Sequence, residues 1–115
     1  MTPQSFSADN TQTGTTTEID VVGAQQLQQK GAQIIDVREP DEFATGHVKG
    51  ATNIPLGQLT NRLKDIRTDE TVLVICKGGN RGKAAQELLK QKNVADVRNV
   101  KGGMIAWQAA QFPIE

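Results

Sequence analysis

The sequence lacks the long apolar segments that membrane and exported proteins carry. Its longest apolar run, residues 72–76, has five residues, whereas a membrane-spanning helix needs about 20. The amino terminus has no basic patch followed by an apolar stretch, so we expect no secretory signal peptide. Thirteen basic side chains balance thirteen acidic ones, which gives no electrostatic reason to expect nucleic acid or a membrane as a partner. We therefore expect a single-domain, cytoplasmic globular protein of 115 residues.

Cysteine and histidine are almost absent. The chain has one of each, Cys76 and His47, which excludes a disulfide framework within the chain and a zinc site built from cysteine and histidine. We predict no bound metal and no organic cofactor. The single thiol is therefore the residue whose chemistry has to be explained.

Residues 1–17 also lack basic side chains. They contain six threonines and, besides Met1, only Phe6 as a sizeable apolar group. Such a segment buries too little apolar surface to offset its conformational entropy. We predict a flexible polar tail over residues 1–17 and one domain over residues 18–115.

The domain alternates short β-like runs with helix-like ones. Residues 71–76 are a continuous, mostly β-branched run of the kind that is buried on both faces of a parallel sheet. In the helix predicted after it, Ala84, Ala85, Leu88 and Leu89 recur at helical spacing. The alternation predicts an α/β fold with a parallel sheet and helices on both faces. The predicted strands are 18–21, 33–37, 51–54, 71–76 and 97–100, and the predicted helices are 23–30, a short helix opened by 39–42, 58–66, 81–91 and 104–110.

A glycine-rich, cationic loop follows the clearest strand and leads directly into a helix. Loops at the carboxyl ends of parallel strands form ligand sites. Glycines let successive N–H groups point toward an anion, and the start of the helix adds partial positive charge. These groups favour a thiolate, which is the nucleophilic form of cysteine. We therefore predict that Cys76 is a catalytic nucleophile rather than an inert core residue, and that the loop binds the substrate with Lys77, Gly78, Gly79, Asn80, Arg81 and Gly82.

Three further segments accompany this loop. Asp36-Val37-Arg38 stands at the end of a predicted strand, residues 42–55 read EFATGHVKGATNIP, and residues 102–107 read GGMIAW. Together with the loop, and in this order, they resemble the rhodanese-homology family of single-domain sulfurtransferases. The resemblance covers essentially all of residues 18–115. It implies a five-stranded parallel sheet flanked by helices.

The resemblance also implies a mechanism. Cys76 would take the outer sulfur of a donor such as thiosulfate and become a persulfide whose charge the loop amides stabilise. The sulfur would then pass to cyanide in assays or to a thiol in cells, with a sulfur-relay protein as a possible partner. Asp36 and Arg38 would be scaffold beside the pocket, and His47 would be structural rather than a general base. Glu42 stands where some thiosulfate-using relatives carry an additional cation.

Two other functions stay open. The chain could be a persulfide carrier or docking module that a partner enzyme loads, since this role needs the same persulfide. It could also be a cysteine-dependent phosphatase or arsenate reductase on the same scaffold. Related phosphatases have a loop one residue longer, and the four residues between Cys76 and Arg81 form a smaller ring that suits one sulfur atom. The spacing therefore favours sulfur transfer.

The charged residues around the loop have alternative roles. Lys77 either attracts an anionic donor at the mouth of the site or is a plain solvated charge. Arg81 either touches the substrate or locks the loop to an acid. Asp36 either accepts hydrogen bonds from the loop or forms an ion pair with Arg38, and Arg38 could itself approach a donor anion.

Overall fold

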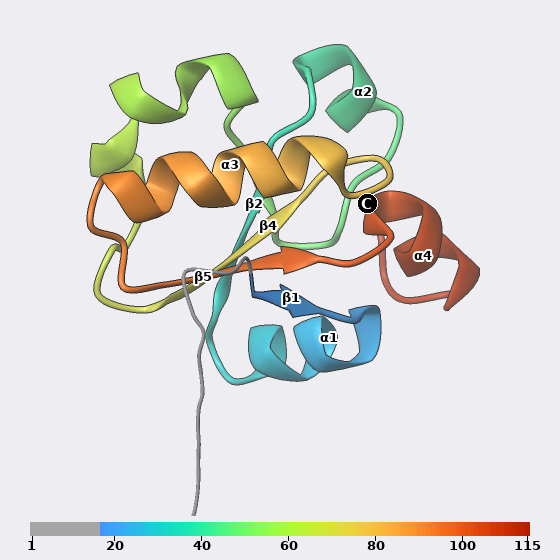
Figure 1. Cartoon of the computed structure of the whole chain (residues 1–115). Helices are drawn as coiled ribbons and strands as arrows, with labels where there is room; N and C mark the ends of the chain where they lie inside the picture. The colour runs from blue at the N-terminus through green and yellow to red at the C-terminus, as the bar shows by residue number, and fades with distance from the viewer. Residues whose placement is uncertain (1–16) are drawn as a thin grey trace, which may run out of the picture.

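The core of the molecule is a five-stranded sheet in which all neighbouring strands are parallel (Figure 1). The computed structural model describes residues 17–115. The strands lie in the order β1-β5-β4-β2-β3, which confirms the predicted parallel α/β sheet. Their bounds are β1 Glu18–Ile19, β2 Gln33–Asp36, β3 Thr52–Asn53, β4 Thr71–Ile75 and β5 Asp96–Val100.

The central strand β4 is the β-branched run that the sequence predicted. It pairs with β2 on one side and β5 on the other, and its residues from Val72 onward are fully buried. In the β2–β4 register Asp36 is opposite Ile75, so β2 and β4 end at the same edge of the sheet. The residues that follow these two strands are therefore brought together.

The first strand is shorter than predicted. The sequence suggested a strand over residues 18–21, but β1 ends at Ile19 and α1 (Val21–Gln29) begins almost at once. The reason is a helix cap: Asp20 Oδ1 accepts a hydrogen bond from the N–H of Gly23 at 2.8 Å. The predicted tail lies outside the described residues except for Thr17, whose carbonyl accepts hydrogen bonds from β5 and from Gln86.

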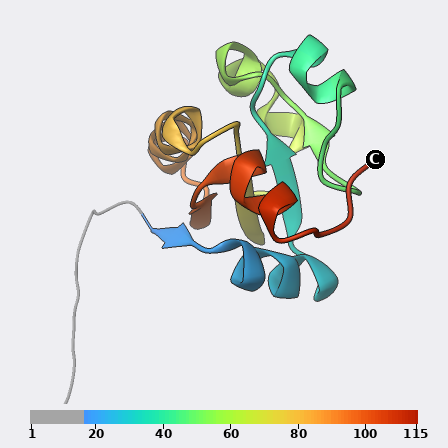
Figure 2. The same cartoon turned by 90° about the vertical axis from the view of Figure 1, so that its right-hand side faces the viewer.

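Helices cover both faces of the sheet, as predicted (Figures 1 and 2). On one face α1 packs with α4 (Gly103–Ala109) around Trp107, which is 1% exposed. On the other face α3 (Asn80–Gln91) packs with the 3₁₀ helix η1 (Leu56–Asn61) around Leu59 and Leu89. The short α2 (Pro40–Ala44) follows β2. None of the helices in residues 17–115 is long and apolar enough to cross a membrane.

The helix α3 buries Ala85 and Leu89 and half-buries Leu88, in keeping with the predicted apolar spacing, but not Ala84. Its buried residues are Gly82, Ala85, Gln86 and Leu89, whereas Ala84 is exposed. These four positions follow the spacing of one helix face, and the polar Gln86 belongs to it because its amide donates to the carbonyl of Val97 in β5 at 2.6 Å. The apolar pattern found Ala85 and Leu89 of this face but not Gly82 and Gln86, since it ignores glycine and glutamine.

The predicted helix 58–66 is also different. It consists of two 3₁₀ segments, η1 and η2 (Leu63–Asp65). Its hydrogen bonds span three residues, as from Arg62 N to Leu59 O at 3.1 Å. A 3₁₀ path needs fewer residues per turn, so the segment buries Leu59 and Ile66 within a short connection to β4.

Candidate active site

Cys76 follows the last residue of β4 and lies four residues before α3. Its place is at the carboxyl edge of the sheet, where the sequence predicted the site. The residue is 1% exposed and belongs to the apolar cluster under α3. It is a free thiol.

Two backbone N–H groups donate to the Cys76 sulfur. Sγ accepts hydrogen bonds from Gly79 N at 3.0 Å and from Gly82 N at 3.3 Å. Within the described part of the chain, the N–H groups of Gly78, Asn80 and Arg81 have no backbone acceptor, as expected at the start of a helix. We call these five N–H groups the sulfur cradle. The two donors on Sγ stabilise negative charge on it, and the other three belong to the same loop and helix start.

The first turn of α4 holds the other side of the loop. Met104 N donates to Cys76 O at 2.8 Å, and Ile105 N donates to Lys77 O at 3.1 Å. Gly103 has a φ of 56°, and a Cβ there would overlap both loop carbonyl oxygens. The loop carbonyls therefore face α4, which leaves the loop N–H groups free to face the sulfur. In the sequence, the pair Gly102-Gly103 predicts a tight strand-to-helix turn, and the contact with the loop carbonyls is seen only in the structure.

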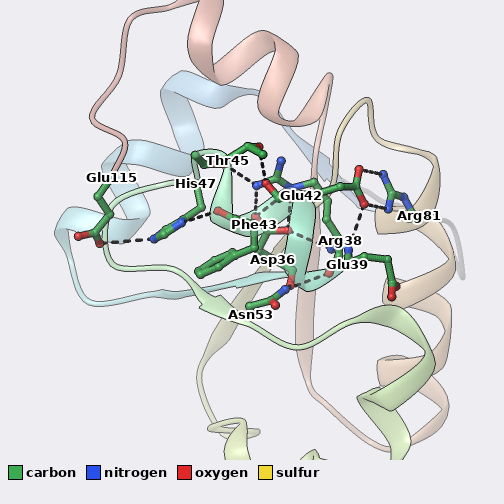
Figure 3. A network of polar contacts seen from close by, with 11 residues as sticks. Asp36, Arg38, Glu39, Glu42, Phe43, Thr45, His47, Asn53, Arg81 and Glu115 are labelled. Atoms are coloured by element: carbon green, nitrogen blue, oxygen red, sulfur yellow. Dashed lines mark hydrogen bonds and ion pairs between the residues drawn. The ribbon is translucent and has the colours of Figure 1, made fainter.

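Arg81 is bound to an acid from α2 (Figure 3). Its guanidinium donates to both carboxylate oxygens of Glu42, at 2.6 and 2.9 Å. The Arg81 hydrogen bond, helped by one from the backbone of Glu39, lowers the pKa of Glu42 to about 2, and the same carboxylate raises the pKa of Arg81. The structure shows the ion pair that locks the loop to an acid, and contact of Arg81 with the substrate stays a prediction.

Asp36 and Arg38 form a buried ion pair beside the loop. Asp36 is fully buried and Arg38 is 6% exposed. The guanidinium donates to the carboxylate through Nε at 3.0 Å and Nη2 at 2.8 Å, and Nη2 also donates to the carbonyl of Gly46. Asn53 donates its amide to the carbonyls of Asp36 and Arg38, at 3.0 and 2.9 Å (Figure 3). Arg38 thus links β2 to the segment after α2, and Asn53 links β3 to β2. Nothing in the sequence around Asn53 indicated this role.

A cleft of about 250 Å³ lies beside the loop. Lys77 is exposed on its rim and has no acidic partner among residues 17–115, whereas the charges of Arg38 and Glu42 are paired. The rim also carries Ile105, which is 59% exposed. A hollow of about 320 Å³ borders Thr71 at the opposite edge of the sheet, and its lining contains no residue of the loop. The cleft beside the loop, in contrast, is lined by Arg38, Glu42, Thr45, Gly46, Lys77, Met104, Ile105 and Gln108.

His47 contacts the protein scaffold. Its Nδ1 is 2.9 Å from the carbonyl of Phe43, and its ring stacks on Phe43 with centroids 3.6 Å apart. Its Nε2 is 3.9 Å from Glu115 Oε2 (Figure 3). These contacts suit the predicted structural role. Among the described residues, no group of three or more His, Cys, Asp or Glu side chains could hold a metal ion.

Comparisons with known proteins agree with this geometry. Residues 22–110 match the family model of the rhodanese-like domain. The uncharacterized protein YqhL of Bacillus subtilis is 46% identical over 76 residues, which span 66% of this chain and only 60% of that protein. A rhodanese-related protein from Thermoplasma volcanium superposes with a TM-score of 0.78 at 31% identity, over 86% of this chain and 97% of that one. The rhodanese-like domain of the Anabaena protein Alr3790 gives 0.79 at 26% identity, over 88% and 80%. The chain belongs to the rhodanese-like domain family.

Proposed function

We propose that the protein is a sulfurtransferase that carries a sulfane sulfur as a persulfide on Cys76. The observation that supports this most directly is the sulfur cradle, in which Sγ already accepts hydrogen bonds from Gly79 N and Gly82 N at 3.0 and 3.3 Å. The family membership of residues 22–110 supports the same class of reaction.

In the first half-reaction the Cys76 thiolate attacks the outer sulfur of thiosulfate. A new S–S bond forms to Cys76, the S–S bond within thiosulfate breaks, and sulfite leaves with the bonding electron pair. The negative charge then lies on the outer sulfur of the persulfide. The N–H groups of Gly78, Asn80 and Arg81 have no backbone acceptor in the described chain, so they are available to donate to that sulfur.

In the second half-reaction an acceptor takes the outer sulfur. A thiolate or cyanide attacks it, the persulfide S–S bond breaks, and the Cys76 thiolate is regenerated as the leaving group. No external oxidant or reductant is consumed. Because a cysteine must be a free thiol in each cycle, we also propose a reducing compartment, the cytoplasm, as the location.

The charges of the cleft favour a small anionic donor. Arg38 and Arg81 are neutralised by Asp36 and Glu42, so Lys77 is the cation of the rim left without an acidic partner among the described residues. A single exposed charge attracts anions weakly and over about 10 Å at 0.1 M salt. Thiosulfate is therefore the donor to test first, and a persulfide delivered by a partner protein is the alternative.

Steady-state kinetics test the proposal. Wild type and Cys76→Ser are assayed with thiosulfate and cyanide, and wild type is assayed in parallel with an aryl phosphate. We expect transfer by wild type and none by Cys76→Ser, since the serine hydroxyl fills nearly the same space but is not ionised near neutral pH. We also expect negligible phosphate hydrolysis by wild type, because the loop between Cys76 and Arg81 is short. Residual transfer by Cys76→Ser within about ten-fold of wild type would contradict the mechanism.

The same assay separates an enzyme from a carrier. Sulfur transfer is measured with free thiosulfate and with a persulfide-bearing protein donor, at equal donor concentration. An enzyme for small donors turns over with thiosulfate. Turnover with the protein donor alone would instead establish a persulfide carrier or docking module.

A further inference from the structure

Asn99 contacts the catalytic loop from the neighbouring strand. It lies in β5, opposite Val74 of β4, and its side chain is fully buried. Its Nδ2 donates to the carbonyl oxygen of Gly79 at 3.0 Å. Gly79 is the residue whose own N–H donates to Cys76 Sγ.

The same side chain also packs against Gly82. A Cβ at position 82 would overlap Asn99 Oδ1, so the amide occupies the space that a side chain at 82 would need. Gly82 provides the second N–H group on Sγ. Asn99 therefore touches both residues that donate hydrogen bonds to the sulfur.

The orientation of the Asn99 amide follows from its surroundings. With Nδ2 facing the Gly79 carbonyl, Oδ1 is buried without a hydrogen-bond partner among the described residues. The opposite orientation would set oxygen against oxygen at 3.0 Å. A buried oxygen without a partner is unfavourable. The Asn99 amide nevertheless has this orientation, because only then does its Nδ2 donate to the Gly79 carbonyl.

The bond to Gly79 matters because this residue has an unusual backbone. Its φ of 112° lies in a region that side chains rarely adopt, and it is the N-cap of α3. Its carbonyl accepts from both Asn99 Nδ2 and Lys83 N, at 3.0 and 3.2 Å. The Gly79 carbonyl shares one planar peptide group with the N–H of Asn80. Holding this carbonyl therefore fixes that peptide plane and limits rotation about the Cα of Gly79, the residue whose own N–H donates to Sγ.

We propose that Asn99 is a positioning residue that directs the N–H groups of Gly79 and Gly82 at the sulfur of Cys76. This inference rests on the proposed function, because it assigns to Asn99 the geometry of the site that forms the persulfide. Asn99 does not touch the reacting atoms. It acts through the loop backbone.

The test compares Asn99→Leu with Gln86→Met. Leucine approximates the shape of asparagine without the N–H donor. Gln86 is the matched control. It is also fully buried, donates to a backbone carbonyl and has an oxygen without a partner among the described residues, but its bonds go to Val97 and Thr17. Each variant removes one buried side-chain amide, that of Asn99 from β5 or that of Gln86 from α3.

The readout is alkylation of Cys76 by iodoacetamide, a neutral reagent, as the ratio of the rates at about pH 7 and pH 9.5. This ratio reports the thiolate fraction, and Gln86→Met shows how far a general loss of stability alone changes it. Loss of one net hydrogen bond to the loop predicts a ratio about five-fold lower in Asn99→Leu and a Gln86→Met ratio within about two-fold of wild type. An unchanged ratio in Asn99→Leu, or equal falls in both variants, would overturn the proposal.

A second measurement needs no variant. Wild-type protein labelled with ¹⁵N is converted to its Cys76 persulfide, or alkylated, and the side-chain amide signals are compared. We expect the Asn99 amide and the Gly79 N–H to shift, and the Gln86 amide to stay. An unmoved Asn99 amide contradicts the proposal, whereas absence of sulfur transfer together with the expected alkylation ratio would refute the proposed function alone.

Discussion

The sulfur cradle and the rim of the cleft are built from different groups. The cradle consists of backbone N–H groups from residues 78–82, held by Asn99 on one side and by the first turn of α4 on the other. The rim is lined by side chains, among which Arg38 and Glu42 are held in ion pairs and Lys77 is exposed. Backbone donors fixed by packing cannot adapt when a neighbour changes, whereas an exposed charge can. Changes in the cradle should therefore affect chemistry strongly, and changes on the rim should affect binding mildly.

Gly82→Ala should have the largest effect. A Cβ at 82 would overlap the side chain of Asn99, so the loop or β5 must move and the N–H of Gly82 is displaced from Sγ. Removing one donor of such a site lowers turnover by about 100-fold or more. Sulfur-transfer kinetics and thermal unfolding check this.

Gly57→Ala is the control for that variant. Its Cβ would have no atom within 4 Å, and Gly57 is not among the residues with positive φ. We expect near-wild-type turnover and melting temperature. Comparable losses in Gly57→Ala and Gly82→Ala would show that the loop is not the sensitive region.

The pair of Glu42 and Arg81 predicts a pH dependence of stability. The pKa of Glu42 is lowered from 4.5 to about 2 in the folded protein, so the pair stabilises the fold fully above pH 4.5. Its contribution should disappear as the pH falls from 4.5 to about 2. Urea unfolding of wild type and Glu42→Gln measures this, and their difference in stability should shrink over that window. A constant difference would mean that the carboxylate is not held by Arg81.

Lys77→Ala should have the smallest effect. We expect a higher KM for thiosulfate with little change in kcat, provided chemistry limits turnover, and a weaker dependence on salt. Lys64→Ala removes an exposed lysine of η2 and should change neither. If Lys77→Ala lowers kcat as much as Gly82→Ala does, then the distinction between cradle and rim is wrong.

The sequence predicted what depends on neighbouring residues. The β-branched run of β4 and the glycine-rich loop after Cys76 are local patterns. So is the alternation of strand-like and helix-like runs that predicts the parallel sheet. The partners of the loop could not be found this way. Glu42 is 39 residues from Arg81 and Asn99 is 20 residues from Gly79, so only the folded topology brings them together.

The errors have the same origin. The apolar spacing in α3 included Ala84, which is exposed, and left out Gln86, which faces the sheet and donates to a carbonyl of β5. A scale of apolar residues does not register such a polar contact. From the sequence, Gly103 is only a turn residue. In the structure it lies so close to the loop carbonyls that a side chain would not fit there. In both positions a contact in space decides the role.

The central claim is that the sulfur cradle holds an additional sulfur on Cys76. Intact mass spectrometry of the native protein after brief treatment with thiosulfate tests it most directly, with Cys76→Ser as the blank. We predict a gain in mass of one sulfur atom in wild type, its loss on treatment with a reducing agent or cyanide, and no gain in the variant. A wild-type mass that stays unchanged with both thiosulfate and a persulfide-bearing donor, or an equal gain in Cys76→Ser, would contradict the account.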